Sequence, residues 1–155
     1  MLVLFDLANH LFKGGERLAR LAGLTTQQWL VLLDIAGDPN FPAPARRRRD
    51  AAGGVLPSSI ARDRGVSRAS VSAVVSQLLE RGLLRQADDP ADGRRRRLVV
   101  TDAGRRSLAR VEPARRRNNQ RLFSGLTPAR RRRLLADLRG CLETLWQDEA
   151  APLSA

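Results

Sequence analysis

The sequence predicts a mainly α-helical fold with a small β-wing. Three observations support this fold class. Apolar residues recur at helical spacing through most of the chain. Two short strand-like runs, 83–87 and 96–101, flank the turn-rich segment DDPADGRR. Just before them, residues 58–81 divide into two helices at a tight turn, so the expected order is helix, helix, helix–turn–helix, two-stranded wing, helix, helix: six helices and a sheet of two to three strands.

The first two helices are expected at residues 2–22 and 26–36. Gly14 and Gly15 lie inside the first, where they mark a kink or a close helix crossing. Thr25 followed by Gln28 forms the pattern of a capping box, which opens the second helix. The first helix takes its apolar stripe from Leu4, Leu7, Ala8, Leu11, Phe12, Leu18 and Leu21, and the second from Trp29, Leu32 and Leu33.

Residues 37–57 hold four prolines and show no apolar periodicity. A connection of this length inside a compact domain is usually functional or disordered. We expect a mobile basic loop, with Val55 and Leu56 forming a short strand at its end. The run Arg46–Arg49 is either a flexible phosphate-binding arm or a solvated face.

Two helices are expected after the wing. Thr101 caps a helix over 102–123 that contains Pro113, which should bend it. Thr127 and Pro128 open the last helix with a capping residue and a proline at the first position. Leu134, Leu138, Cys141 and Leu145 then follow at spacings of 4, 3 and 4, a stripe wide enough for both a core and a partner helix. We expect Cys141 to be a buried, inert thiol, and residues 151–155 to fray.

The charge balance points to an acidic partner. The 155 residues carry 28 basic and 16 acidic side chains, a formal net charge of +12. Lys13 is the single lysine, which leaves 27 arginines, whose planar fork suits phosphates and guanine edges. Aromatic residues are 4% of the chain, too few to build the stacking platforms of single-strand readers. Double-stranded DNA is therefore the favoured partner.

The same composition argues against chemistry and membranes. One His and one Cys supply neither a metal cluster nor an internal disulfide. The sequence offers no phosphate-cradling glycine loop and no Ser/His/Asp set with an arguable spacing, so we expect no enzyme, no catalytic residue, no metal and no cofactor. Asp6, Asn9 and His10 interrupt the apolar N-terminal run, which argues against a signal peptide or membrane span. We expect a cytoplasmic protein in which His10 pairs with Asp6, one helical turn away.

Residues 57–76 fit a helix–turn–helix. Ala61 is small where the two helices cross, and Gly65 supplies the positive φ of the turn. Val71 and Val74 point back into the core beside Ile60. The outward face of the second helix then carries short side chains and an arginine, which suits a helix whose N-terminal end enters the major groove. A solvated helix with low-propensity serines is the alternative, and the adjoining wing favours DNA; the candidate contacts here are Ser67, Arg68, Ser70, Ser72, Ala73, Ser76 and Gln77.

The wing resembles that of a known family. Asp92-x-Arg94, five residues and then Val100-Thr101 resemble the wing signature of the MarR (multiple-antibiotic-resistance regulator) family, Asp-x-Arg-x5-Leu-Thr. LTTQQWLVLLDIA resembles the family's second helix, SSIARDRGVSRASVSAVVSQLLERGLL its helix–turn–helix, and LFSGLTPARRRRLLADL the junction of its last two helices. Three departures stand out: Val100 replaces Leu, Gln86 and Ala87 stand where the family often has two arginines, and the 37–57 loop is longer than usual.

The resemblance implies a winged-helix homodimer. Residues 1–24 and 102–150 would form a helical dimerisation region, and residues 25–101 the DNA-binding lobe. Arg94 would reach the minor groove with Asp92 orienting its guanidinium, because a narrow minor groove concentrates negative potential. Arg95 joins Arg94 and Asp92 as a candidate DNA contact.

Family members commonly bind small aromatic or anionic molecules between the dimer helices and the DNA-binding lobe. The resemblance therefore implies a small-molecule effector, for which the candidate residues are His10, Lys13, Arg17 and Trp29. Taken singly, Trp29 fits a core residue and the other three fit surface positions at least as well.

The favoured interpretation is a ligand-responsive transcriptional regulator, expected to be a repressor that binds a pseudo-palindromic operator as a homodimer. A sequence-indifferent architectural DNA-binding protein is the first alternative. An enzyme or a protein–protein adaptor built on the same scaffold is the second, since fold does not fix function.

Overall fold

The computed structural model describes residues 2–39, 54–64, 66–89 and 92–148. Within them the fold is mainly α-helical with a small antiparallel sheet, as predicted. The predicted ends of the first two helices and of both strands agree with the structure to within one residue. The elements are α1 (Leu2–Leu21), α2 (Thr26–Ile35), α4 (Pro57–Asp63), α5 (Arg68–Glu80), β1 (Leu84–Asp88), β2 (Arg96–Val100), α6 (Asp102–Leu122) and α7 (Pro128–Asp148).

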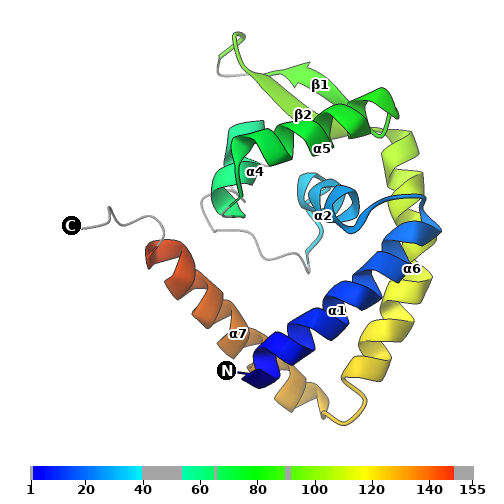
Figure 1. The fold of residues 1–155 in the computed structure, drawn as a ribbon, viewed down its shortest axis with the longest axis vertical. Helices are drawn as coiled ribbons and strands as arrows, with labels where there is room; N and C mark the ends of the chain where they lie inside the picture. Colours follow the sequence, from blue (N-terminus) through cyan, green and yellow to red (C-terminus); the bar gives the residue numbers. More distant parts are fainter. Residues whose placement is uncertain (1, 40–53, 65, 90–91, 149–155) are drawn as a thin grey trace.

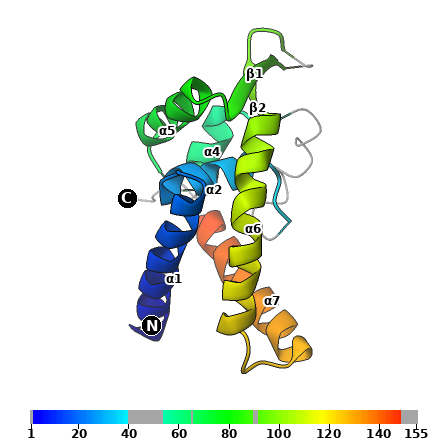
Figure 2. The same ribbon diagram turned by 90° about the vertical axis from the view of Figure 1, so that its right-hand side faces the viewer.

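The elements separate into a lobe and long arms. Helices α2, α4 and α5 lie beneath the β1–β2 wing, which projects from one end of the molecule (Figure 1). Helices α1 and α6 run from this lobe towards the opposite end, where the chain turns from α6 into α7 (Figures 1 and 2). No helix in the described ranges has both the length and the apolar character to cross a membrane.

The turn from α1 into α2 follows the predicted capping chemistry. The Thr25 hydroxyl accepts a hydrogen bond from the Gln28 backbone N–H, and the Gln28 side chain accepts one from the Thr25 backbone N–H. Helix α1 is one continuous helix past Gly14 and Gly15. A Cβ built at Gly15 would lie 3.6 Å from Thr26 Cγ2, so Gly15 marks the close crossing of α1 and α2.

The core lies where α2, α4 and α5 meet the wing. Ile60 and Ala61 of α4 are buried against the inner face of α5, as predicted. Gly65, expected to supply a positive φ between these helices, lies outside the described residues. The α5 residues that face the core are Val71, Val74, Val75 and Leu78, and Trp29, Leu32, Leu98 and Val100 are buried in the same cluster.

The wing is a two-stranded antiparallel ribbon in which Leu84 pairs with Val100 and Asp88 with Arg96. The predicted third strand at 55–56 is a single bridge, in which Val55 exchanges two backbone hydrogen bonds with Leu98. Most of the predicted basic loop, residues 40–53, lies outside the described part of the chain.

Gly104 lets α6 start against the wing. Thr101 caps α6 by accepting a hydrogen bond from the Gly104 N–H. A Cβ built at Gly104 would lie 2.3 Å from the carbonyl oxygen of Leu83 and 2.7 Å from Val100 Cγ1. Backbone must therefore move to accommodate any side chain here.

We predict that Gly104→Ala lowers the free energy of unfolding by about 2 kcal/mol, because overpacking outweighs the better helix propensity of alanine. Urea unfolding of the full chain measures this. Gly140→Ala is the matched control, because a Cβ at Gly140 meets nothing within 4 Å, and this substitution should stabilise the chain slightly. Equal effects of the two substitutions would contradict the packing argument.

Helix α6 is tied to the end of α2 by a charged cluster. Arg115 Nη2 lies 2.8 Å from Asp38 Oδ2 and 2.7 Å from Glu112 Oε2, and the side chains of Arg115 and Asp38 are largely buried. Glu112 also accepts a hydrogen bond from Arg116 Nε. Its bonds to Arg116, together with the charge of Arg115, hold the pKa of Glu112 below the ordinary value of 4.5.

A carboxyl whose pKa is lowered by folding stabilises the folded state above its unfolded pKa. We therefore predict that the contribution of Glu112 is complete above about pH 5 and is lost as the pH falls below 4.5. In Glu112→Gln this part of the acid sensitivity should disappear, which urea unfolding at pH 3.5, 4.5 and 6 measures. An unchanged pH profile in the variant would contradict the assignment.

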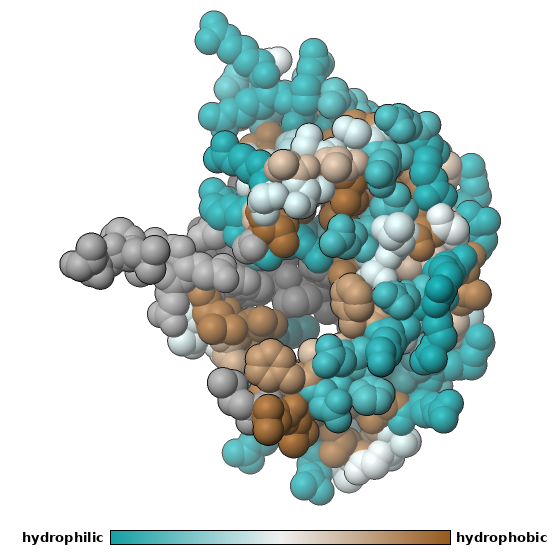
Figure 3. All heavy atoms as spheres, viewed as in Figure 1, coloured by the Kyte–Doolittle hydropathy of each residue, from teal (hydrophilic) through white to brown (hydrophobic). Residues whose placement is uncertain are grey.

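Helix α7 exposes its apolar stripe in the single chain. Leu134, Leu138 and Leu145 are all exposed. Cys141 lies among them and is exposed as well, so the predicted buried thiol is wrong for one chain. The reason is that α7 packs too little on the lobe to cover this face. Of the two roles predicted for the stripe, core and contact with a partner helix, only contact with a partner helix remains. Apolar side chains gather over the arms at the end away from the wing (Figure 3).

Candidate nucleic-acid interface

The N-terminal end of α5 is open and polar. Ser67 caps the helix by accepting a hydrogen bond from the Ser70 backbone N–H, and the two hydroxyl oxygens lie 2.8 Å apart. Arg68, Ser72 and Ser76 are exposed on the side of α5 away from the core. The arrangement leaves a helix with short side chains and one cation free to approach a polar surface.

Three of the predicted α5 contacts lie beside a groove. Ser70, Ala73 and Gln77 line a groove of about 690 Å³ between α5 and the α1–α2 turn. Gln77 Oε1 accepts a hydrogen bond of 2.8 Å from Gln28 Nε2. The predicted contacts on α5 are therefore all exposed, and three of them also border this groove.

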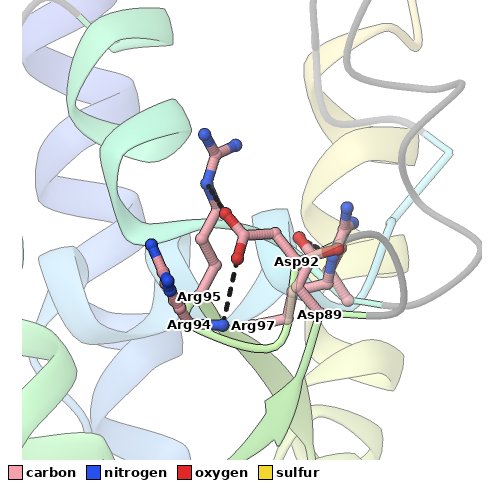
Figure 4. A network of polar contacts seen from close by, with 6 residues as sticks. Asp89, Asp92, Arg94, Arg95 and Arg97 are labelled. Carbon is pink, nitrogen blue, oxygen red and sulfur yellow. Dashed lines mark hydrogen bonds and ion pairs between the residues drawn. The ribbon is translucent and has the colours of Figure 1, made fainter.

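The wing tip is held by Asp92. Its Oδ1 accepts a hydrogen bond from the backbone N–H of Arg94, and its Oδ2 lies 3.1 Å from Arg95 Nε (Figure 4). The expectation that Asp92 orients the guanidinium of Arg94 is thus corrected: the carboxylate fixes the backbone at Arg94 and pairs with the side chain of Arg95. Within the described residues the exposed Arg94 guanidinium makes no hydrogen bond or ion pair.

The base of the wing carries an ion pair that sequence reasoning missed. Arg97 Nε donates a 2.8 Å hydrogen bond to Asp89 Oδ2, and the two side chains are 14% and 3% exposed (Figure 4). Arg97 Nη1 also donates to the carbonyl oxygen of Gly54. This pair joins the two strands where the tip begins. In the sequence Arg97 is one of four consecutive arginines, and nothing in the run marks it as the buried one.

The four predicted effector residues are not brought together. Trp29 is buried in the core, while His10, Lys13 and Arg17 are exposed on α1. None of the four lines the groove between α1, α2 and α5. Its α1 wall is formed by Phe12, Glu16 and Arg20, and its α2 side includes Thr25, Thr26 and Gln27.

The described residues were also searched for side chains that could bind a metal ion. No group of three or more His, Cys, Asp or Glu side chains that could hold a metal ion occurs in the described ranges.

His10 makes the predicted local pair with Asp6: its Nδ1 lies 2.9 Å from the Asp6 carbonyl oxygen and 3.8 Å from Oδ1.

A helix–turn–helix followed by a two-stranded wing, with helical arms drawn from both ends of the chain, defines a winged helix–turn–helix protein. The family model described as MarR family matches residues 22–95. The solved structures similar in fold to this chain include transcriptional regulators described as MarR family. Over residues 22–95, just under half of the chain, this protein is similar to the MarR family.

Two curated relatives align with about two thirds of the chain. A transcriptional regulatory protein for the hcr operon of Thauera aromatica is 37% identical over 100 residues, which are 64% of this chain and 58% of that protein. The transcriptional activatory protein BadR of Rhodopseudomonas palustris is 32% identical over 102 residues, 66% of this chain and 52% of BadR. The matched part thus spans little more than half the length of either relative.

Solved structures share the fold across nearly the whole chain. A MarR-family regulator from Listeria monocytogenes, complexed with 26mer DNA, gives a TM-score of 0.75 at 16% identity and covers 95% of this chain and 89% of its own. CouR from Rhodococcus jostii RHA1, bound to p-coumaroyl-CoA, gives a TM-score of 0.69 at 22% identity, with 93% and 89% covered. At these identities the likeness concerns the fold.

Proposed function

We propose that this protein is a transcriptional regulator that binds double-stranded DNA as a homodimer. Each protomer would place the open face of α5 in a major groove and Arg94 in the adjacent minor groove of one duplex. A two-fold axis between the protomers would require a pseudo-palindromic operator, with half-sites one turn, about 34–36 Å, apart.

The observation that carries the proposal is the exposed guanidinium of Arg94, which has no hydrogen bond or ion pair to any described residue and lies on a tip where Asp92 holds the backbone. Because the backbone at Arg94 is already held, binding has to order only the side chain. The guanidinium, which has no partner among the described residues, keeps its donors for phosphate or bases. Arg68, Ser72 and Ser76 are exposed on α5, and α5 lies beside the wing (Figure 1). The Listeria monocytogenes relative is complexed with 26mer DNA, which supports a DNA-binding role for this fold.

The exposed apolar side chains on the arms support the dimer. Leu2, Val3 and Phe5 of α1 are 84%, 80% and 65% exposed in the single chain, and Leu145 of α7 is 57% exposed. An exposed apolar patch of this kind is typical of an oligomer interface. The region 1–24 together with 102–150 would accordingly pair with its copy, while residues 25–101 contact DNA.

The proposal includes a small aromatic or anionic effector. The groove between α1, α2 and α5 offers apolar walls from Phe12 and Leu24 and a cation in Arg20. Thr26 adds a buried hydroxyl that has no hydrogen-bond partner within the described residues. CouR, a structural relative, is bound to p-coumaroyl-CoA, an aromatic acyl thioester, which favours this class of ligand.

Selection of bound fragments from genomic DNA, followed by titration of the recovered duplex, tests the function. A regulator should prefer its recovered duplex over random DNA by at least about 1,000-fold. Equal affinity for both would favour the architectural alternative, and failure to bind any duplex would favour an adaptor. A reporter gene behind the recovered site then shows whether binding represses, as we propose, or activates, as the name of BadR indicates for that relative.

The electrostatic part of the proposal predicts a steep dependence on salt. Two copies of Arg68, Arg94 and Arg95 give six candidate phosphate contacts, and each neutralised phosphate contributes about −0.9 to the slope of log K against log salt. We predict a slope of about −5 between 50 and 300 mM salt for the recovered duplex. A slope near zero would contradict binding through these arginines.

A further inference from the structure

Gln28 of α2 uses every polar atom of its side chain to join three segments. Its Oε1 accepts hydrogen bonds from the Thr25 backbone N–H at 3.0 Å and from Arg81 Nη1 at 3.4 Å. Its Nε2 donates to Gln77 Oε1 at 2.8 Å. The Thr25 N–H and the Arg81 guanidinium only donate, so the amide oxygen must face them and the amide nitrogen must face Gln77. The amide therefore has one orientation that satisfies all its partners.

Arg81 adds a second link between the same segments. It directly follows α5, and its Nη1 donates a 2.9 Å hydrogen bond to the carbonyl oxygen of Gly23 in the α1–α2 turn. Gln77 and Arg81 lie four residues apart, about one helical turn. The C-terminal part of α5 is thus fastened to the turn at two points, on Gln28 and on Gly23.

Two directional attachments add to the apolar packing in fixing the angle of α5. The inner face of α5 packs through Val71, Val74, Val75 and Leu78, and such contacts depend on area rather than on direction. Hydrogen bonds weaken steeply when their angle changes. Helix α5 is 13 residues long, about 20 Å, so a swing of 10° about its C-terminal end moves its N-terminal end by about 3.5 Å. This displacement equals the rise of one base pair.

We propose that Gln28, Gln77 and Arg81 are positioning residues, which set the angle of α5 relative to α1 and thereby the half-site spacing that a dimer accepts. Helix α1 carries the exposed apolar side chains of the proposed dimer interface, so this network links the recognition helix to the partner. The inference rests on the proposed function. It reassigns Gln77, a candidate DNA contact from the sequence, to an internal role.

The first test is a double-variant cycle on urea unfolding of the full chain. Gln28→Met and Gln77→Met remove the hydrogen bond with little change of volume. Each should lower the unfolding midpoint, and the double variant should lie within error of the lower single variant, because the same bond is lost. Gln27→Met is the matched control: Gln27 is exposed one residue away and makes no hydrogen bond in the described part of the chain. If the two substitutions lowered the unfolding midpoint additively, Gln28 and Gln77 would not be linked by a hydrogen bond, and the proposal would be overturned.

The second test measures spacing. The inverted repeat recovered by selection is rebuilt with its half-sites one or two base pairs closer or further apart. The natural chain should prefer the recovered spacing at least tenfold over a change of one base pair. In Gln28→Met and Gln77→Met this preference should fall below threefold, while affinity for a single half-site changes less than twofold. Gln27→Met should keep the natural preference.

A conservative variant separates positioning from general loosening. Gln28→Glu keeps an acceptor for Thr25 and Arg81, and the Gln77 amide can turn to donate to it, so spacing preference should return to within twofold of the natural chain. A Gln77→Met chain that loses preference for one base inside the half-site, with spacing unchanged, would show that Gln77 reads a base and would overturn the proposal. If the natural chain selects no duplex from genomic DNA, the proposed function is overturned. The double-variant unfolding cycle still tests the hydrogen bond between Gln28 and Gln77 in that case.

Discussion

Replacing Arg94 with alanine is expected to weaken binding of the dimer to the selected duplex about a thousandfold, because each of the two copies loses a charge-assisted hydrogen bond that contributes about 2 kcal/mol. The fold should be unchanged. Asp92 holds the wing tip through the Arg94 backbone N–H and the Arg95 side chain, and neither contact involves the Arg94 guanidinium. Titration of the labelled duplex at fixed salt measures the loss, and urea unfolding checks the fold.

Arg139→Ala is the matched control for this loss. Arg139 is an exposed arginine of α7, so its removal lowers the net charge by the same amount away from the wing. Its effect on binding should stay below threefold. If both variants lost the same affinity, the contribution of Arg94 would be that of net charge alone, and its placement in a groove would be contradicted.

Replacing Asp89 with alanine is expected to lower the free energy of unfolding by about 3 kcal/mol, since it leaves the charge of Arg97 enclosed without its partner. The Arg97 side chain is 14% exposed and Asp89 is 3% exposed, so water can replace the lost carboxylate only in part. The pair also holds the Gly54 carbonyl through Arg97, so the bridge between Val55 and Leu98 should open with it. Urea unfolding and amide hydrogen exchange at Leu98 measure the two effects.

The neighbouring aspartate supplies the control. Asp88 pairs with Arg96, but both side chains are more than half exposed, and such a pair contributes about 0–1 kcal/mol. Asp88→Ala should therefore lower the free energy of unfolding by less than a third of the decrease expected for Asp89→Ala. The double variant Asp89→Ala/Arg97→Ala should recover part of the stability, because the enclosed charge is removed as well. A double variant less stable than Asp89→Ala would contradict a buried ion pair.

Local chemistry explains why most of the fold could be predicted from the sequence. Thr25, Ser67 and Thr101 each cap the helix that follows, as expected from their position before an apolar-periodic run. The strands were recognisable because the turn-rich tip separates two short runs of fixed length. Such signals depend on neighbours in the chain and need no knowledge of the tertiary structure.

The parts that could not be predicted depend on contacts across the fold. Arg97 differs from its neighbouring arginines only because β2 turns it towards Asp89 and Gly54. Asp92 was expected to orient Arg94, but its side chain reaches Arg95 instead. Gln77 looked like part of an outward face, although Gln28, 49 residues away, occupies its amide. Helical periodicity gives the side of α5 on which a residue lies, not the element that meets it there.

The candidate effector residues, which the structure does not bring together, illustrate the same point. His10, Lys13 and Arg17 share one side of α1, but the groove is lined by the adjacent side, with Phe12, Glu16 and Arg20. The side of α1 that faces the lobe is decided by its packing against α2 and α6. The residue pattern of α1 alone does not indicate it.

The central claim is that paired chains place α5 and the tip of the wing in adjacent grooves of one duplex. Hydroxyl-radical footprinting on the selected duplex tests it most directly, because this reagent cuts from the minor groove. We expect two protected minor-groove segments placed symmetrically about a dyad, both lost in Arg94→Ala while the selected sequence is still bound. Protection that is continuous along the duplex, or unchanged in Arg94→Ala, would contradict it.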